Sequence, residues 1–165
     1  MKNLWLIRHA KSSWEIDGIS DIDRPLNARG YTDAHEMARR LKKDIRQCLV
    51  VSSPAVRAIS TALIFARTLG ITASDILVRP GLYETGTEDY LSVIGSLSDE
   101  HDSVLVFGHN PIITDTANLL AGTTIEEIPT AGMIGVVFEE NRWKKASVAG
   151  GKLALYDFPK NKSAG

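Results

Sequence analysis

Short apolar runs alternate with amphipathic stretches along most of the chain. Runs of four to eight apolar residues, rich in branched and aromatic side chains and bounded by turn signals, are typical of buried strands. Six segments of three to six residues follow this pattern and predict six strands, over residues 4–7, 49–51, 76–78, 104–107, 133–138 and 152–156. The segment 139–151, between the last two, is rich in turn residues, so we expect those two strands to form a hairpin-like pair.

Amphipathic stretches separate the earlier strands and predict helices. In the first stretch, apolar residues recur three and four positions apart and should face the sheet: Tyr31, Ala34, Ala38, Leu41 and Ile45. The second helix should start at Pro54, carry an apolar stripe from Ala55 to Leu69, and end at Gly70. A third should begin with Thr87 as its cap, and a fourth should run from Pro111 to Leu120.

Helices between successive buried strands predict an α/β protein. Right-handed crossovers give a mainly parallel sheet covered on both faces, and the late hairpin-like pair leaves room for a mixed sheet. The length of 165 residues, 44% of them apolar, fits one domain with a sizeable core. We expect this domain to span residues 1–158, followed by a polar, mobile tail over residues 159–165.

Charge and cysteine content exclude several classes of protein. The formal net charge is −1, from 19 basic and 20 acidic residues, so we expect neither nucleic acid nor an anionic membrane as a partner. Cys48 is the single cysteine, which excludes an internal disulfide and a thiolate zinc cluster and favours a cytoplasmic protein. Arg8 ends the first apolar run far short of a signal core or a membrane span, so we expect a soluble protein.

Ionisable and polar residues follow three of the predicted strands. Arg8 and His9 end the first, Ser52-Ser53-Pro54 with Arg57 follows the second, and Gly108-His109-Asn110 follows the fourth. Ligands of open α/β sheets bind beyond the carboxyl ends of parallel strands. These residues are therefore expected to converge on one site.

This combination of side chains suits a phosphoryl group. Two arginines hold a tetrahedral oxyanion through planar, bidentate guanidinium groups, and helices that begin near Arg57 and His109 add positive dipole ends. An imidazole placed in line with the phosphorus is a nucleophile that splits hydrolysis into two steps. His9 is the candidate nucleophile. Most of the catalysis would then come from positioning and charge stabilisation, without a metal or other cofactor.

Taken in order, the motifs resemble the histidine phosphatase superfamily, which includes the phosphoglycerate mutases. The resemblance spans nearly the whole chain and rests on Arg8-His9-Ala10-Lys11-Ser12-Ser13-Trp14, Ser52-Ser53-Pro54 with Arg57 and Thr61-Ala62, and Gly108-His109-Asn110-Pro111. The short length and the segment 21–26 with Gly30 are similar to the small phosphohistidine phosphatases. The resemblance implies a three-layer α/β/α sandwich, with His9 transiently phosphorylated and Arg8, Arg57 and His109 around the phosphoryl oxygens.

Some positions depart from the family pattern. Ala10 replaces the usual glycine, which should be tolerated unless the backbone there needs a positive φ. Lys11 and Glu15 stand where mutase-like members have a glutamate and an asparagine. Only 14 residues separate His9 from Arg24, too few for the long insertions that close over the substrate of a mutase. We therefore expect an open phosphatase site that admits a phosphorylated side chain of another protein.

Other candidate residues have two interpretations each. By resemblance Glu84 is the general acid, and the alternative is a surface glutamate in a turn. Arg24 and Ser12 are candidates for additional phosphate ligands, although Asp23 and Arg24 also suit a turn before Pro25. Ser52 and Ser53 lack a Gly-x-Ser-x-Gly elbow, so a capping role fits better than a nucleophile. Trp14 and Trp143 fit either an entrance wall or core packing.

Three functional hypotheses follow. The leading one is a metal-independent phosphatase that works through phospho-His9 on a protein phosphohistidine, with a small phosphomonoester as the alternative substrate. A second is a non-catalytic phosphate-binding or phosphoprotein-binding module, against which the intact His9 and His109 argue. The third, a metallohydrolase that uses these two histidines as ligands, lacks an accompanying motif with metal-ligand spacing.

Overall fold

A computed structural model describes residues 1–45 and 47–161. Its centre is a six-stranded sheet in the order β3-β2-β4-β1-β5-β6. All six strands coincide with predicted apolar runs to within two residues: β1 Lys2–Arg8, β2 Leu49–Ser52, β3 Leu77–Val78, β4 Ser103–Gly108, β5 Met133–Phe138 and β6 Lys152–Asp157.

The sheet is mixed. β1 pairs in parallel with β4, β4 with β2, and β2 with β3, whereas β5 is antiparallel to both β1 and β6. In the register of β1 and β4, Arg8 lies opposite Gly108, so the two strands end side by side. The carboxyl ends of β1, β2 and β4 therefore meet at one edge, where ligands of parallel sheets bind.

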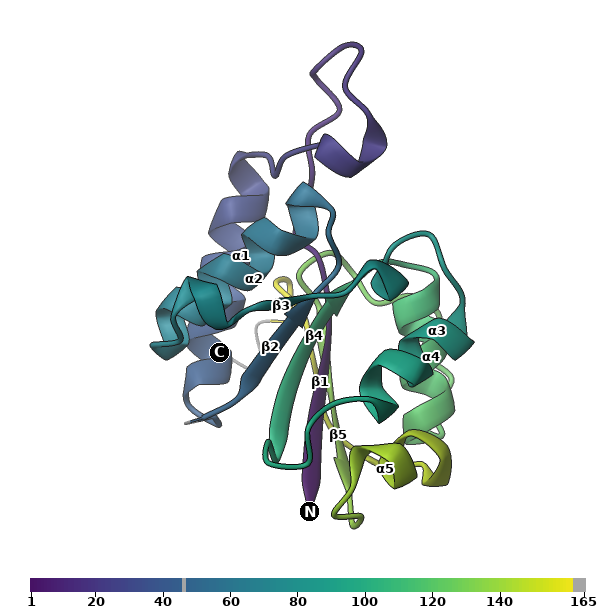
Figure 1. Cartoon of the computed structure of the whole chain (residues 1–165). Coiled ribbons are helices and arrows are strands. Elements are labelled where there is room, and N and C mark those ends of the chain that lie inside the picture. Colours follow the sequence, from purple (N-terminus) through teal and green to yellow (C-terminus); the bar gives the residue numbers. More distant parts are fainter. Residues whose placement is uncertain (46, 162–165) are drawn as a thin grey trace.

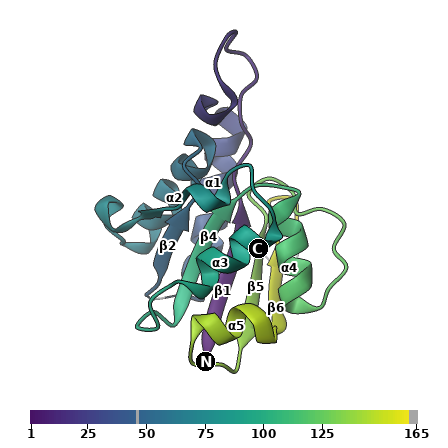
Figure 2. The same ribbon diagram turned by 45° about the vertical axis from the view of Figure 1, so that its right-hand side comes forward.

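Helices cover both faces of the sheet, which confirms the three-layer α/β/α sandwich. α1 (Ala28–Lys42) and α2 (Val56–Leu69) lie on one face, and α3 (Thr87–Gly95), α4 (Ile112–Ala121) and α5 (Trp143–Ala149) lie on the other (Figures 1 and 2). Each face has its own apolar core, built on one side around Met37 and Phe65 and on the other around Ile94 and Trp143.

The start of α1 differs from the prediction. Asn27 caps this helix by accepting a 2.8 Å hydrogen bond from the Gly30 amide, so the helix begins at Ala28, three residues before the first residue of the predicted apolar face. Tyr31 is 47% exposed and does not face the sheet, whereas Met37 is fully buried. The predicted apolar face is therefore wrong at Tyr31, and the buried face includes Met37 instead.

Three further helix starts shift by one or two residues. α2 begins at Val56, two residues after Pro54, and Pro111 is the cap of α4 rather than its first helical residue. Thr87 is the first residue of α3, because Gly86 is the cap and its amide donates to the Asp89 carboxylate at 3.0 Å. These shifts leave the order of elements unchanged.

The largest difference lies in the segment predicted as turns only. Residues 143–149 form α5, because tertiary contacts stabilise a helix that the local sequence does not signal. The Trp143 side chain is fully buried, its backbone amide donates to the Asp99 carboxylate, and its indole donates to the His101 carbonyl, both at 2.8 Å. These contacts tie α5 to the loop before β4.

The end of the described chain is held by Arg40. Its guanidinium forms an ion pair with Asp157 and donates to the carbonyl groups of Phe158, Pro159 and Asn161. Residues 162–165 of the predicted tail lie outside the described residues. Within residues 1–45 and 47–161, no helix combines the length and the apolar character needed to cross a membrane.

Candidate active site

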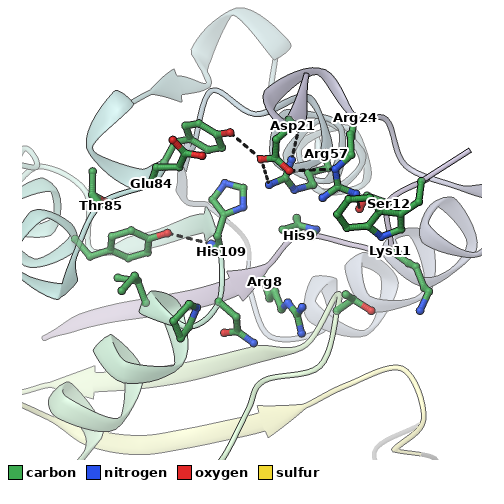
Figure 3. Close-up of a pocket in the computed structure, with 17 residues that line it drawn as sticks. Arg8, His9, Lys11, Ser12, Asp21, Arg24, Arg57, Glu84, Thr85 and His109 are labelled. Carbon is green, nitrogen blue, oxygen red and sulfur yellow. Dashed lines mark hydrogen bonds and ion pairs between the residues drawn. The ribbon is translucent and has the colours of Figure 1, made fainter. Parts of the chain in front are cut away.

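A cleft of about 490 Å³ lies at the edge where β1, β2 and β4 end (Figure 3). Every side chain that the sequence suggested for catalysis or phosphate binding lines this cleft: Arg8, His9, Ser12, Arg24, Arg57, Glu84 and His109. Ser52, Ser53 and Pro54, which the sequence predicts at the same edge, do not line it. His9 and His109 lie between Arg8 on one side and Asp21 and Arg57 on the other (Figure 3). The structure thus brings together chain segments that lie about 25 to 50 residues apart in sequence.

His9 directly follows β1 and is held in one orientation. Its ring Nδ1 lies 2.7 Å from the Ala10 carbonyl oxygen, which only accepts, so Nδ1 carries the proton. The backbone is fixed as well, because the His9 amide donates to Gly108 at 3.2 Å and the Ala10 amide donates to the Thr61 hydroxyl at 3.0 Å. With Nδ1 protonated, Nε2 keeps a lone pair and is the nucleophilic atom of the neutral ring.

Alanine at position 10 fits this loop. Among the described residues, those other than glycine with a left-handed backbone are Glu84 and Ala131, so Ala10 needs no positive φ. Its methyl group is fully buried within the core on the α1 and α2 face. The departure from the family's glycine therefore has no conformational cost at this site.

Arg57 and Arg8 line the cleft, and each has a buried guanidinium nitrogen that lacks a partner among the described residues. Arg57 lies in the first turn of α2, and its two terminal nitrogens donate to the Asp21 carbonyl at 2.7 Å and to the Asp21 carboxylate at 3.0 Å. Arg8 donates through Nη1 to the Ile128 carbonyl at 2.9 Å. In both arginines Nε is buried and has no hydrogen-bond partner among the described residues. A buried donor without a partner is unfavourable, so an anion between the two groups would be stabilising.

His109 is fixed through its backbone amide. The His109 amide donates at 3.0 Å to the hydroxyl of Tyr90, which itself donates to the Leu82 carbonyl at 2.8 Å. Gly108 is required here, because a Cβ atom would lie 2.5 Å from the Tyr90 oxygen. The His109 ring centroid lies 5.2 Å from that of His9, and its Nδ1 is a further buried atom without a partner in the described part of the chain.

Asp21 is the residue that sequence reasoning missed. Its carboxylate accepts hydrogen bonds from Tyr83 at 2.7 Å, Arg57 at 3.0 Å and Arg24 at 3.1 Å (Figure 3). The hydrogen bond from Tyr83 is the main cause that lowers the pKa of Asp21 to about 2, so the carboxylate stays charged. It therefore orients Arg57 and Arg24 rather than transferring a proton.

Arg24 is anchored to the loop beside His9 rather than to Asp23, its neighbour in sequence. Arg24 donates to the Ser12 hydroxyl at 2.7 Å, and its guanidinium stacks 3.5 Å from the centre of the Trp14 ring. Asp23 instead accepts a 2.7 Å hydrogen bond from Ser20. The two tryptophans have different positions. Trp14 lines the cleft and is 78% exposed, whereas Trp143 is fully buried in the core.

Glu84 lies at the cleft wall next to Tyr83. It is exposed and its φ of 51° is left-handed. Such a backbone costs a residue with a Cβ atom about 1 kcal/mol or more and is found mainly at functional sites. The position is thus compatible with proton donation to a bound ligand, which remains a prediction.

Burial keeps both histidines neutral. Desolvation is the largest cause that lowers the pKa of His9 to about 3 and that of His109 to about 4, and the nearby arginines act in the same direction. A neutral imidazole is the form that attacks phosphorus. In the described part of the chain, no three His, Cys, Asp or Glu side chains come together in an arrangement that would hold a metal ion.

The lowered pKa values predict that neither ring titrates between pH 8 and pH 5. Because the folded pKa values lie below pH 5, falling pH leaves both rings unprotonated over this whole range. We expect the ¹⁵N resonances of His9 and His109, assigned with His→Gln variants, to stay constant. A histidine peptide in the same buffer should titrate near about 6.5. A His9 midpoint between pH 6 and 7 would contradict this electrostatic description.

Comparisons with known proteins agree with this geometry. The sequence profile of the histidine phosphatase superfamily (branch 1) matches residues 4–92. An uncharacterized Mycobacterium tuberculosis protein, Rv1276c, is 34% identical over 166 residues, which cover 92% of this chain and 98% of that protein. A solved structure from Agrobacterium tumefaciens, assigned as the phosphohistidine phosphatase SixA, is 26% identical with a TM-score of 0.77, and the match covers 94% of this chain and 97% of that one.

A more distant structure shows the same fold. It is a mycobacterial glucosyl-3-phosphoglycerate phosphatase, 14% identical with a TM-score of 0.70, and the match covers 96% of this chain and all of that one. The matched profile spans more than half of the chain and includes Arg8, His9 and Arg57. The protein is therefore a phosphatase that belongs to the histidine phosphatase superfamily, branch 1.

Proposed function

We propose that this phosphatase hydrolyses protein phosphohistidine through a covalent phosphoryl intermediate on His9, without a metal ion. The observation that carries the proposal is the state of His9, a neutral ring whose Nδ1 is held by the Ala10 carbonyl. His9, whose Nε2 keeps its lone pair, lines the same cleft as Arg8, Arg57 and His109, and each of these three has a buried nitrogen without a partner in the described part of the chain. A nucleophile and donors for three phosphoryl oxygens are thus combined in one site.

Two balanced steps follow from this arrangement. In the first, Nε2 of His9 forms a bond to phosphorus as the bond from phosphorus to the substrate imidazole nitrogen breaks, and the released imidazole takes a proton from solvent. In the second, water attacks phospho-His9, gives inorganic phosphate and returns the lone pair to Nε2. In both steps Arg8, Arg57 and His109 would stabilise the charge on the equatorial oxygens.

The shape of the entrance favours a protein substrate. Residues 10–25 form a loop that rises beyond the carboxyl ends of the parallel strands (Figure 1), and Ser12, Trp14 and Arg24 of this loop line the cleft. Trp14 is exposed on this loop at the cleft, and its stacking on Arg24 fixes its position. Exposed tryptophans are common anchors of protein interfaces. A small phosphomonoester is the alternative substrate, supported by the position of Glu84 in the same cleft.

The Trp14→Ala variant tests recognition of a protein substrate. We expect its preference for a histidine-phosphorylated carrier protein over phosphoimidazole, as the ratio of kcat/KM values, to fall roughly tenfold, because an anchor to the polypeptide is lost. Ile16→Ala is the matched control, since Ile16 lies in the same loop, is 50% exposed and does not line the cleft. An unchanged ratio in Trp14→Ala would exclude Trp14 from substrate recognition.

The Glu84→Gln variant tests the general acid. An alkoxide leaving group needs a proton that imidazole needs much less, so kcat for phosphoserine should fall by about 10²- to 10⁴-fold and that for phosphohistidine far less. Glu88→Gln, an exposed change in the first turn of α3 outside the cleft, is the control. Equal rates of phosphoserine hydrolysis in wild type and Glu84→Gln would show that Glu84 is not the general acid.

The proposed substrate is tested by phosphate release from a histidine-phosphorylated carrier protein, measured in chelator beside para-nitrophenyl phosphate. His9→Ala serves as the blank. Selective turnover of the phosphoprotein supports the proposal. Turnover of the small ester alone would keep phospho-His9 as the intermediate and change the substrate to a phosphomonoester, and no turnover of either would favour a binding module.

A further inference from the structure

We infer that Ser53 is a positioning residue that sets the tautomer of His109, so that its Nδ1–H faces the phosphoryl group. The inference extends the proposed function, in which His109 donates to a phosphoryl oxygen. It starts from a contact between segments that are 56 residues apart in sequence, since the Ser53 hydroxyl oxygen lies 2.7 Å from Nε2 of His109.

The surroundings of Ser53 determine the direction of this hydrogen bond. The side chain is fully buried, and its oxygen already accepts a 3.2 Å hydrogen bond from the Ala55 amide. In the described part of the chain, the hydroxyl proton has no acceptor other than Nε2 of His109. Because an unsatisfied buried hydroxyl is unfavourable, Ser53 donates and His109 Nε2 accepts.

The consequence appears on the other side of the ring. A neutral imidazole carries one proton, so an accepting Nε2 leaves that proton on Nδ1. Nδ1 of His109 is buried, and among the described residues it has no partner. The opposite tautomer would place a lone pair there, which would repel a phosphoryl oxygen. The His109 tautomer that Ser53 selects instead places a hydrogen-bond donor at Nδ1. The unpartnered Nε atoms of Arg8 and Arg57 are donors as well.

Other contacts keep the pair in register. The Ser53 amide donates to the Phe107 carbonyl at 3.0 Å, two residues before His109, and the His109 amide is held by the Tyr90 hydroxyl. Neither group therefore moves freely relative to the other.

The first readout is spectroscopic and does not depend on turnover. In ¹⁵N-histidine-labelled protein at pH 7, a long-range ¹H–¹⁵N correlation spectrum should show Nδ1 of His109 protonated and Nε2 unprotonated. In Ser53→Ala the Nε2-protonated tautomer should appear. Ser52→Ala is the matched control, because Ser52 is also fully buried but its hydroxyl donates to the Ser53 carbonyl at 2.9 Å. That variant should keep the wild-type tautomer.

The second readout is binding of inorganic phosphate, followed by NMR titration. Ser53→Ala should bind phosphate roughly tenfold more weakly, the scale of one hydrogen bond, and Ser53→Thr, which keeps the hydroxyl, should recover most of that loss. An Nε2-protonated His109 in the wild type, or the same tautomer in wild type and Ser53→Ala, would overturn the inference. Neither readout requires phosphohistidine hydrolysis, so failure of the proposed substrate would remain a separate result.

Discussion

Replacement of His9 by alanine is expected to lower kcat by at least about 10⁴-fold on any substrate of this phosphatase, the scale on which loss of a covalent nucleophile acts. Without Nε2 no phosphoenzyme forms. The arginines and His109 can still bind the phosphoryl group, but they do not form a covalent bond to it. Rapid-quench measurement of phosphate release and of label on the protein tests both parts. Activity near that of the wild type would exclude His9 as the nucleophile.

The fold should survive this change. His9 is 7% exposed but lies beyond the end of β1, at the wall of the cleft rather than in either apolar core. Its main side-chain hydrogen bond is local, to Ala10, so we expect a change in unfolding free energy of about 1 kcal/mol. His35→Ala, in exposed helix surface, is the control for loss of an imidazole. Loss of the cooperative melting transition in His9→Ala but not in His35→Ala would invalidate the use of His9→Ala as a blank.

The Arg57→Lys variant keeps the charge and should still lose activity, by about 10²-fold in kcat/KM. The guanidinium of Arg57 uses two nitrogens to bind Asp21 and leaves Nε for the ligand. A lysine ammonium cannot hold Asp21 in this way and also present a donor at the same point. The measurement is kcat/KM, together with the Kd for inorganic phosphate, which should rise.

Arg67→Lys provides the matched control for that change. Arg67 lies on the same helix, in its exposed last turn, away from the cleft. Its replacement should leave kcat/KM within about twofold, as for most surface changes. Equal activity of Arg57→Lys and Arg67→Lys would remove Arg57 from the phosphate site and with it the anchoring role assigned to Asp21.

The succession of strands along the chain and the convergence of His9 with His109 could be predicted, because both follow from local patterns. Apolar runs mark β1 and β4, and parallel strands place their carboxyl ends at one edge. In the structure Arg8 and Gly108 are register partners, so the two histidines that follow them are neighbours. The positions of the strands therefore predict that these residues share one edge, whereas the adjacency of β1 and β4 is known only from the structure.

The supporting residues could not be predicted in the same way. Asp21 binds Arg57 and Tyr83, which are 36 and 62 residues away, and Ser53 binds His109 across 56 residues. No spacing or periodicity in the sequence signals contacts of this kind. The same reason explains α5, whose helix depends on the burial of Trp143 against distant residues. The sequence therefore does not predict the hydrogen-bond network that orients the side chains of the site.

The most direct test of the central claim is the fate of phosphorus in a single turnover. The enzyme is mixed in excess with a ³²P-histidine-labelled carrier protein in chelator, quenched in alkali within milliseconds to seconds, and digested. We predict that the label passes to the peptide that contains His9, as an acid-labile and alkali-stable phosphohistidine, before it appears as phosphate. Release of phosphate with no label on that peptide at any time, or equal labelling of the corresponding peptide in His9→Ala, would contradict the mechanism.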